Sequence, residues 1–100
     1  MKNSLIEKIK EYLSKQPIEK AWLFGSMSRG EERPDSDVDI LVRFDPAGNV
    51  GLFQHAAMIS ELEGLLMKSV DLVSESAIFP WVRDNVEKEK ILIYERETAG

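Results

Sequence analysis

The sequence predicts one small domain of the α+β class that spans residues 1–100. A chain of 100 residues, 43% hydrophobic and 31% charged, has the size and balance of a single globular domain. Three segments carry apolar residues at the three- and four-residue intervals of a helix, and four short apolar runs are typical of strands. The expected order is helix, strand, turn, strand, helix, strand, helix, strand.

The first helix is expected over Ser4–Lys15. Its apolar residues share one side of a helix: Leu5, Ile6, Ile9, Tyr12 and Leu13. Ser4 followed by Glu7 has the spacing of a capping box, and Pro17 ends the helix. Two strands are expected next, at Ile18–Phe24 and Val38–Phe44.

The second half of the chain begins with a loop at Asp45–Gly51 and a long helix over Val50–Met67. A third strand is expected at Val70–Val73. Pro80 is a typical first-turn residue, so the third helix is expected from Pro80 to about Lys90. The last strand is expected at Ile91–Tyr94.

Composition and charge exclude several functions. Eighteen acidic against thirteen basic residues give a net charge of -5, the wrong sign for general binding to a nucleic-acid backbone. The absence of cysteine excludes disulfides, thiolate metal sites and thiol nucleophiles. Charged residues interrupt the stretch Met1–Leu13, and no apolar run approaches the ~20 residues needed to cross a membrane. We therefore expect a soluble cytoplasmic protein without a membrane partner.

A chain this small meets a large substrate on an open face or at a border with another subunit, so we expect a homo- or hetero-oligomer.

Three aspartates are the candidate metal ligands. Alternate residues of a strand share a face, so Asp37 and Asp39 point the same way with Cα atoms roughly 6.5–7 Å apart and can share one divalent ion. Asp71 lies in the apolar run Val70–Val73, where a lone charge needs a partner. If its strand pairs beside that of Asp37, three carboxylates converge, and hard oxygen ligands of this kind favour Mg²⁺.

Each of these acids also has a simpler interpretation. Asp37 and Asp39 can belong to a solvated turn, and Asp71 can be a charge at the sheet rim that is paired with Lys68 or Arg43. The combination of all three with a phosphate-binding turn argues against chance.

The candidate phosphate site follows the first strand. Gly25 and Ser26 lie where that strand ends and a helical turn is expected to begin, which leaves backbone N–H groups free to bind phosphate. Ser26 adds a hydroxyl donor, and the guanidinium of Arg29 suits phosphate oxygens. Acids that hold a metal beside such a cradle predict phosphoryl or nucleotidyl transfer.

Three other residues receive no catalytic role. His55 is expected to be a surface or core histidine. Trp22 and Trp81 are expected in the core or at a subunit contact, and Trp81, next to Pro80, can also face a partner.

The stretch Gly25-Ser26, ten residues, Asp37-Val38-Asp39 resembles the signature of the polymerase-beta-like nucleotidyltransferase superfamily, and in particular its minimal nucleotidyltransferase (MNT) group. The resemblance covers nearly the whole chain, with Val70-Asp71-Leu72-Val73 as the strand of the third carboxylate. Ser28 stands where the family often has alanine, which keeps a small residue. It implies a mixed β-sheet flanked by helices and a nucleoside triphosphate substrate, with ATP as the family's preference.

The resemblance also implies a role for each site residue. Asp37 and Asp39 would hold two Mg²⁺ ions, and Asp71 would complete the site of the ion that activates an acceptor hydroxyl. Gly25 and Ser26 would hold the outer phosphates, and Arg29 would steady the triphosphate while the hydroxyl attacks the α-phosphate.

In the best understood members of the MNT group, the domain is an antitoxin that adds AMP to a tyrosine of a HEPN-domain RNase toxin. The resemblance therefore implies a HEPN-domain partner, and the small acidic chain fits docking on another protein. Two alternatives stay open. One is nucleotidylation of a small molecule, for which relatives carry an extra substrate domain, and the other is an antitoxin that neutralises its partner by binding alone.

Overall fold

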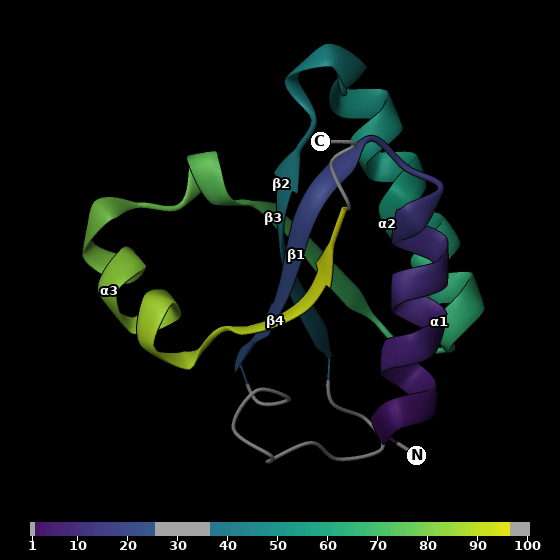
Figure 1. The fold of residues 1–100 in the computed structure, drawn as a ribbon, viewed down its shortest axis with the longest axis horizontal. Coiled ribbons are helices and arrows are strands. Elements are labelled where there is room, and N and C mark those ends of the chain that lie inside the picture. The colour runs from purple at the N-terminus through teal and green to yellow at the C-terminus, as the bar shows by residue number, and fades with distance from the viewer. Residues whose placement is uncertain (1, 26–36, 97–100) are drawn as a thin grey trace.

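The computed structural model describes residues 2–25 and 37–96. In these residues, four strands form one sheet in the order β3-β2-β1-β4 (Figure 1). The strands are β1 (Ile18–Phe24), β2 (Val38–Phe44), β3 (Val70–Ser74) and β4 (Ile91–Glu95). β1 is antiparallel to β2 and β4, whereas β2 and β3 are parallel. The sheet is therefore mixed, and with helices on both sides the fold is of the α+β class, as the sequence predicts.

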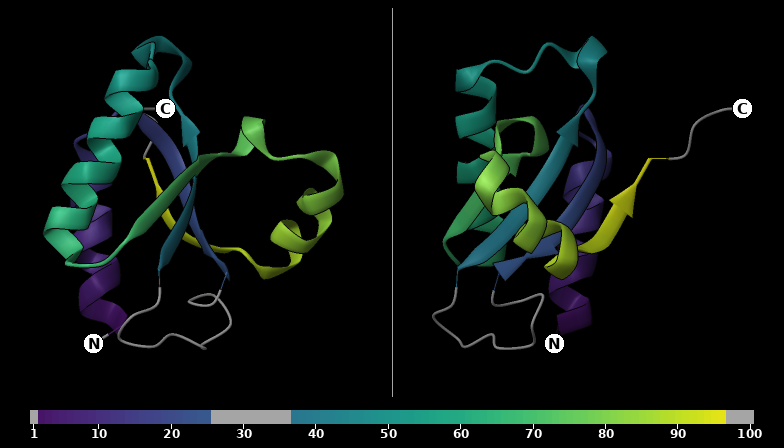
Figure 2. Two further views of the ribbon diagram at one scale, coloured as in Figure 1. Left: turned by 180° about the vertical axis from the view of Figure 1, so that it is seen from behind. Right: turned by 90° about the vertical axis from the view of Figure 1, so that its left-hand side faces the viewer.

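The helices divide the molecule into layers. α1 (Lys2–Ser14) and α2 (Leu52–Leu66) cover one face of the sheet, and α3 (Pro80–Glu89) lies on the other side (Figures 1 and 2). The larger core fills the space under α1 and α2 and includes Ile9, Ile40 and Leu62, which are fully buried. A smaller core on the side of α3 is formed by Trp22, Leu41 and Val86. Each face of the sheet thus buries its own set of apolar side chains, as in a strand packed on both sides.

The unit β2-α2-β3 produces the parallel pair. Two parallel strands cannot be joined by a tight turn and need a crossover, which here is α2. α2 is followed by Met67, whose φ of 56° is left-handed and whose N–H donates to Glu63 O at 2.9 Å. The chain then reverses direction and enters β3 beside β2.

Most predicted elements are confirmed, with differences at the helix ends. β1 and β2 have the predicted bounds, and β3 and β4 are each one residue longer than predicted. α1 begins at Lys2, so Ser4 lies inside the helix and the predicted capping box is wrong. α2 begins at Leu52 and ends at Leu66, because Gly51 is still extended and Met67 is left-handed.

The end of the sheet opposite to Gly25 is closed by a polar contact. Arg96 donates from Nη1 to Asp45 Oδ2 at 2.7 Å and from Nη2 to Gln16 O at 3.0 Å. Asp45 also accepts from the N–H of Ala47 at 2.9 Å, in a 3-10 turn inside the predicted loop. The hydrogen bond from Ala47 and that from Arg96 hold the pKa of Asp45 below its ordinary value. This contact joins the end of β4 to the loops that follow α1 and β2.

Within the described parts of the chain, no helix has the length and apolar character needed to span a bilayer.

Replacing Gly64 with alanine is expected to stabilise the protein. Gly64 lies inside α2 on its exposed side, and a Cβ there meets no atom within 4 Å. Glycine inside a helix costs about 0.5–1 kcal/mol relative to alanine. Thermal unfolding of Gly64→Ala should show a rise in Tm of a few degrees. Gly48→Ala is the matched control and should lower the Tm, because its Cβ would lie 2.4 Å from Cβ of Pro17.

The Asp45–Arg96 contact predicts a pH dependence of stability. The pKa of Asp45 is lower in the folded protein, so its contribution is complete above the unfolded pKa of about 4 and is lost as the pH falls through the folded pKa. Asp45→Asn should be less stable than the wild type in urea at pH 7, and the difference should shrink toward pH 2. Glu7→Gln, which changes an exposed carboxylate 3.9 Å from Lys10, should show little difference at either pH. An Asp45→Asn deficit that is equal at both pH values would contradict the assignment.

Candidate active site

Two carboxylates are set beside each other at one end of the sheet. Asp39 is the second residue of β2, Asp71 is the second residue of β3, and the parallel register pairs the two positions. The strands start together because the N–H of Val38 donates to Ser69 O at 2.9 Å. Neighbouring strands lie about 4.8 Å apart, and paired residues point to the same face. The pairing of the third acid's strand beside β2, on which the predicted site depends, is therefore present.

Asp37, the third of the predicted acids, lies close to Asp39 in the main chain. It is exposed and comes directly before β2, two residues from Asp39. Asp39 is half-buried and Asp71 is exposed. No group of three or more histidine, cysteine or acidic side chains in residues 2–25 and 37–96 is arranged to hold a metal ion. The strand register thus brings Asp39 beside Asp71 only, and the predicted convergence of all three acids is not seen as a ready-made cluster of side chains in these residues.

Gly25 makes room for the carboxylate of Asp39. The preceding residue, Phe24, is the partner of Asp39 in the β1–β2 register. Gly25 has a φ of +73°, and a Cβ built on it would lie 2.3 Å from Oδ2 of Asp39. Only glycine adopts this conformation without strain and leaves this space. The end of β1 and the start of β2 are therefore fitted to each other at the acids.

Ser26 and Arg29, the other residues of the predicted phosphate site, lie outside the described residues. The phosphate cradle therefore stays a prediction.

The smaller core supports the acids from the adjacent row of the sheet. Trp22 pairs with Leu41, two residues along β2 from Asp39, and both side chains are buried. Nζ of Lys90 lies 4.3 Å from the centroid of the Trp22 ring, and Arg43 Cζ lies 5.7 Å from it. Cations at this distance are attracted to the face of an aromatic ring. The prediction of Trp22 as a core residue is confirmed, and Lys90 helps to fasten the end of α3 to the sheet.

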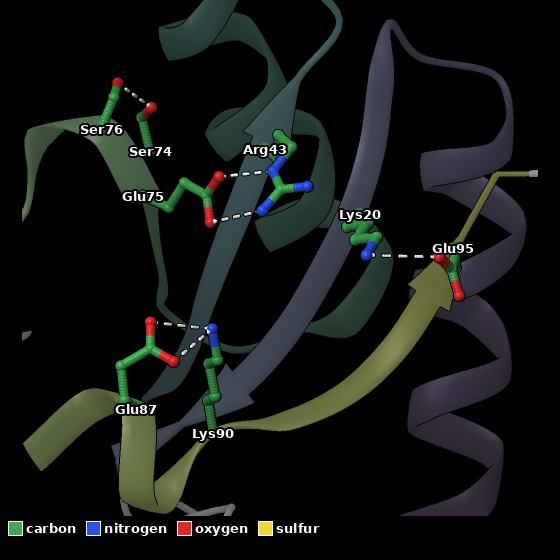
Figure 3. A network of polar contacts seen from close by, with 8 residues as sticks. All are labelled: Lys20, Arg43, Ser74, Glu75, Ser76, Glu87, Lys90 and Glu95. Carbon is green, nitrogen blue, oxygen red and sulfur yellow. Dashed lines mark hydrogen bonds and ion pairs between the residues drawn. The ribbon is translucent and has the colours of Figure 1, made fainter. Parts of the chain in front are cut away.

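Ion pairs also lie on this side of the sheet (Figure 3). Arg43 donates to Glu75, which raises the pKa of the guanidinium further. The other pairs in the figure are Lys90–Glu87 at 2.9 Å and Lys20–Glu95 at 3.3 Å. Arg43 thus contacts Glu75 and not Asp71, in contrast to the simpler interpretation of Asp71 as the partner of Arg43.

An open cavity of about 240 Å³ lies between α3 and the segment after β3. It is lined by Leu41, Glu75, Ser76, Ile78, Arg83 and Glu87. Leu41 follows Asp39 on the same face of β2, so the cavity begins one row of side chains away from the acid.

Two polar residues of α2 reach the strand of Asp71. His55, for which no catalytic role was predicted, contacts Leu72 O through Nε2, and Glu63 accepts from the N–H of Val70. The one signal in the sequence is their position near the apolar side of α2, where a polar side chain needs a partner. Trp81, which was expected in the core or at a contact with a subunit or partner, is 76% exposed and stacks on Phe79, so it lies outside the core.

The site thus consists of a parallel strand pair, β2 and β3, which carries acids at one end next to Gly25. Residues 7–99 match the family described as polymerase beta, nucleotidyltransferase. The chain belongs to this family and is an enzyme of the nucleotidyltransferase class.

Relatives with similar sequences cover most of this chain. A protein of Methanocaldococcus jannaschii, provisionally named a protein adenylyltransferase, is 33% identical over 91 residues, which are 89% of this chain and 91% of that protein. The protein adenylyltransferase MntA of Thermococcus cleftensis is 34% identical over 84% of this chain and 83% of its own length.

Solved structures share the fold. A toxin-antitoxin structure with AMP-PNP superimposes with a TM-score of 0.76 at 23% identity, over 92% of this chain and 74% of that chain. A complex of the tri-AMPylated HEPN toxin of Shewanella oneidensis with its MNT antitoxin gives 0.73 at 21% identity, over 96% and 74% of the two chains. At these identities, the likeness establishes the fold alone.

Gly25→Ala is expected to damage the site. The left-handed conformation costs an alanine about 1–2 kcal/mol, and the new Cβ would push the carboxylate of Asp39 from its place. Thermal unfolding should show a lower Tm, and the predicted binding of a divalent ion, followed with Mn²⁺ by electron paramagnetic resonance, should weaken. Gly51→Ala is the control, because its Cβ would meet no atom within 4 Å. If Gly25→Ala bound Mn²⁺ as the wild type does, the fit of Gly25 to Asp39 would have no functional weight.

Proposed function

We propose that this enzyme is a protein adenylyltransferase that transfers AMP from ATP to a tyrosine hydroxyl of a HEPN-domain toxin and thereby acts as the antitoxin. The observation that carries the proposal is the β2–β3 register, which sets Asp39 beside Asp71 next to Gly25. Family membership gives the reaction class, and the names of the relatives support a protein acceptor. The cytoplasmic location expected from the sequence stays a prediction.

The three acids have the chemistry of a magnesium site. Carboxylate oxygens are the donors that Mg²⁺ prefers, and the absence of a side chain at Gly25 lets the carboxylate of Asp39 occupy its place at the end of the sheet. Asp37, Asp39 and Asp71 would hold the ions, of which the family resemblance implies two. Bound Mg²⁺ supplies neutralisation of phosphate charge and orientation of the reacting oxygens.

The remaining residues position the substrates. Gly25 and Ser26 would bind the outer phosphates of ATP, and Arg29 would hold the triphosphate in line. The acceptor hydroxyl gives up its proton to water, its oxygen forms a bond to the α-phosphorus, and the bond from that phosphorus to the bridging oxygen breaks, which releases pyrophosphate. Asp71 is exposed on the edge strand β3, which supports a role in which it meets an acceptor from another protein.

A HEPN-domain acceptor is supported by the complexes that share this fold. One contains AMP-PNP, an analogue of ATP, and another contains a HEPN toxin that carries three AMP groups. The small size and the net charge of -5 suit a chain that docks on a basic protein surface and not on a nucleic acid.

The double variant Asp37→Asn, Asp39→Asn is expected to abolish AMP transfer and to keep the fold. Neither side chain belongs to the buried core, so the loss of activity should not come from unfolding. The wild type or the variant is incubated with the partner HEPN protein, ATP and Mg²⁺, and the mass of the partner is then measured by mass spectrometry. The wild type should add one or more AMP units to the partner, and the variant should add none.

The variant Glu7→Gln, Asp84→Asn removes the same number of carboxylates elsewhere, both of them exposed, and should be as active as the wild type. Tight binding of the wild type to the partner without a mass change would replace the proposal with inhibition by binding alone. Transfer to a small-molecule hydroxyl, with none to the partner, would indicate the small-molecule alternative.

A further inference from the structure

β3 is an edge strand whose outer side faces α2. In the sheet order β3-β2-β1-β4, only one side of β3 is paired with another strand. The carbonyl of Ser69 faces β2, because it accepts from the N–H of Val38. Alternate residues of a strand direct their backbone groups to opposite sides, so the groups of Val70 and Leu72 face outward. These two residues flank Asp71 in the chain.

Two side chains of α2 bind these outward groups. Oε2 of Glu63 accepts from the N–H of Val70 at 3.0 Å, and Nε2 of His55 donates to Leu72 O at 2.7 Å. Both contacts are partly buried. The ring of His55 also packs edge-on against Phe44, with centroids 5.5 Å apart. The helix thus takes the place of a further strand along this edge.

The two contacts hold the backbone immediately before and after Asp71. A slip of one residue in a strand turns every side chain to the opposite face, which here would move Asp71 away from Asp39. The neighbouring strand holds β3 from one side only, and the two α2 side chains hold it from the other. A backbone N–H or C=O that is partly shielded from water costs free energy when it has no partner, so both contacts favour this register.

We propose that His55 and Glu63 are positioning residues for Asp71: they fix the edge strand on both sides of this carboxylate and so keep it in register with Asp39. The proposed role of Asp71 in transfer rests on the proposed function above. Neither side chain touches substrate in this scheme, and both act through the backbone of β3.

The test compares alanine variants with conservative ones. The double variant His55→Ala, Glu63→Ala loses both contacts. In the double variant His55→Gln, Glu63→Gln, one amide can donate to Leu72 O and the other can accept from the N–H of Val70. We expect the alanine variant to lose about 10- to 100-fold in Mn²⁺ affinity, measured by electron paramagnetic resonance in the presence of AMP-PNP. With the HEPN partner as acceptor, kcat for AMP transfer should fall by a similar factor, while KM for ATP stays nearly unchanged. The glutamine variant should recover most of both losses.

Glu61→Ala is the matched control on the same helix. It removes the hydrogen bond from Tyr12 that joins α1 to α2 and leaves β3 untouched. This variant should lose stability but keep its Mn²⁺ affinity and kcat.

Amide hydrogen exchange separates this inference from the proposed function. Exchange of the Val70 and Asp71 amides should speed up in the alanine variant and not in Glu61→Ala. If the wild type transfers no AMP, the proposed function fails, while Mn²⁺ affinity and exchange still decide whether the two residues position Asp71. The inference is overturned if the alanine variant matches the wild type in Mn²⁺ affinity, or if the glutamine variant is as impaired as the alanine one.

Discussion

The parallel pairing of β2 with β3 is the constraint on which the candidate site depends. Asp39 and Asp71 come from distant parts of the chain and become neighbours only because the two strands start at the same level. A parallel pair requires a crossover, and α2 provides it while burying Met58, Leu62 and Leu66 against the sheet. The packing free energy of α2 therefore maintains the arrangement of the acids.

The acids lie at the end of the sheet where apolar packing stops. Along β2, Leu41 is buried beneath the side of α3, whereas Asp39, two residues earlier on the same face, is half-buried and Asp37 is exposed. The larger core on the opposite face continues under the acids with Val38 and Ile40. Charged side chains can thus remain near solvent while their backbone is held by a rigid sheet, which is what a site for a charged substrate needs.

Local patterns predicted the elements well and their ends less well. β1 and β2 have the predicted bounds because their apolar runs stop at Gly25 and at Asp37, where the character of the sequence changes abruptly. The predicted start of α1 was wrong, because the helix begins at Lys2, before the predicted cap at Ser4. The predicted end of α2 was wrong, because the left-handed backbone of Met67 ends the helix at Leu66. Neither depends strongly on side-chain type, and a methionine gives no warning of a positive φ.

The sequence by itself determined that Asp37 and Asp39 share a face opposite to Val38 and Ile40, because alternation of side chains is a property of any single strand. It also singled out Asp71 as a charge in an apolar run that needs an explanation. Only the tertiary structure decided that Asp71 stands beside Asp39, that Gly25 makes room for the carboxylate of Asp39, and that His55 and Glu63 hold the edge strand. These contacts join residues far apart in the chain, and which strands and helices meet is decided by the packing of the whole core and not by the spacing of residues within a segment.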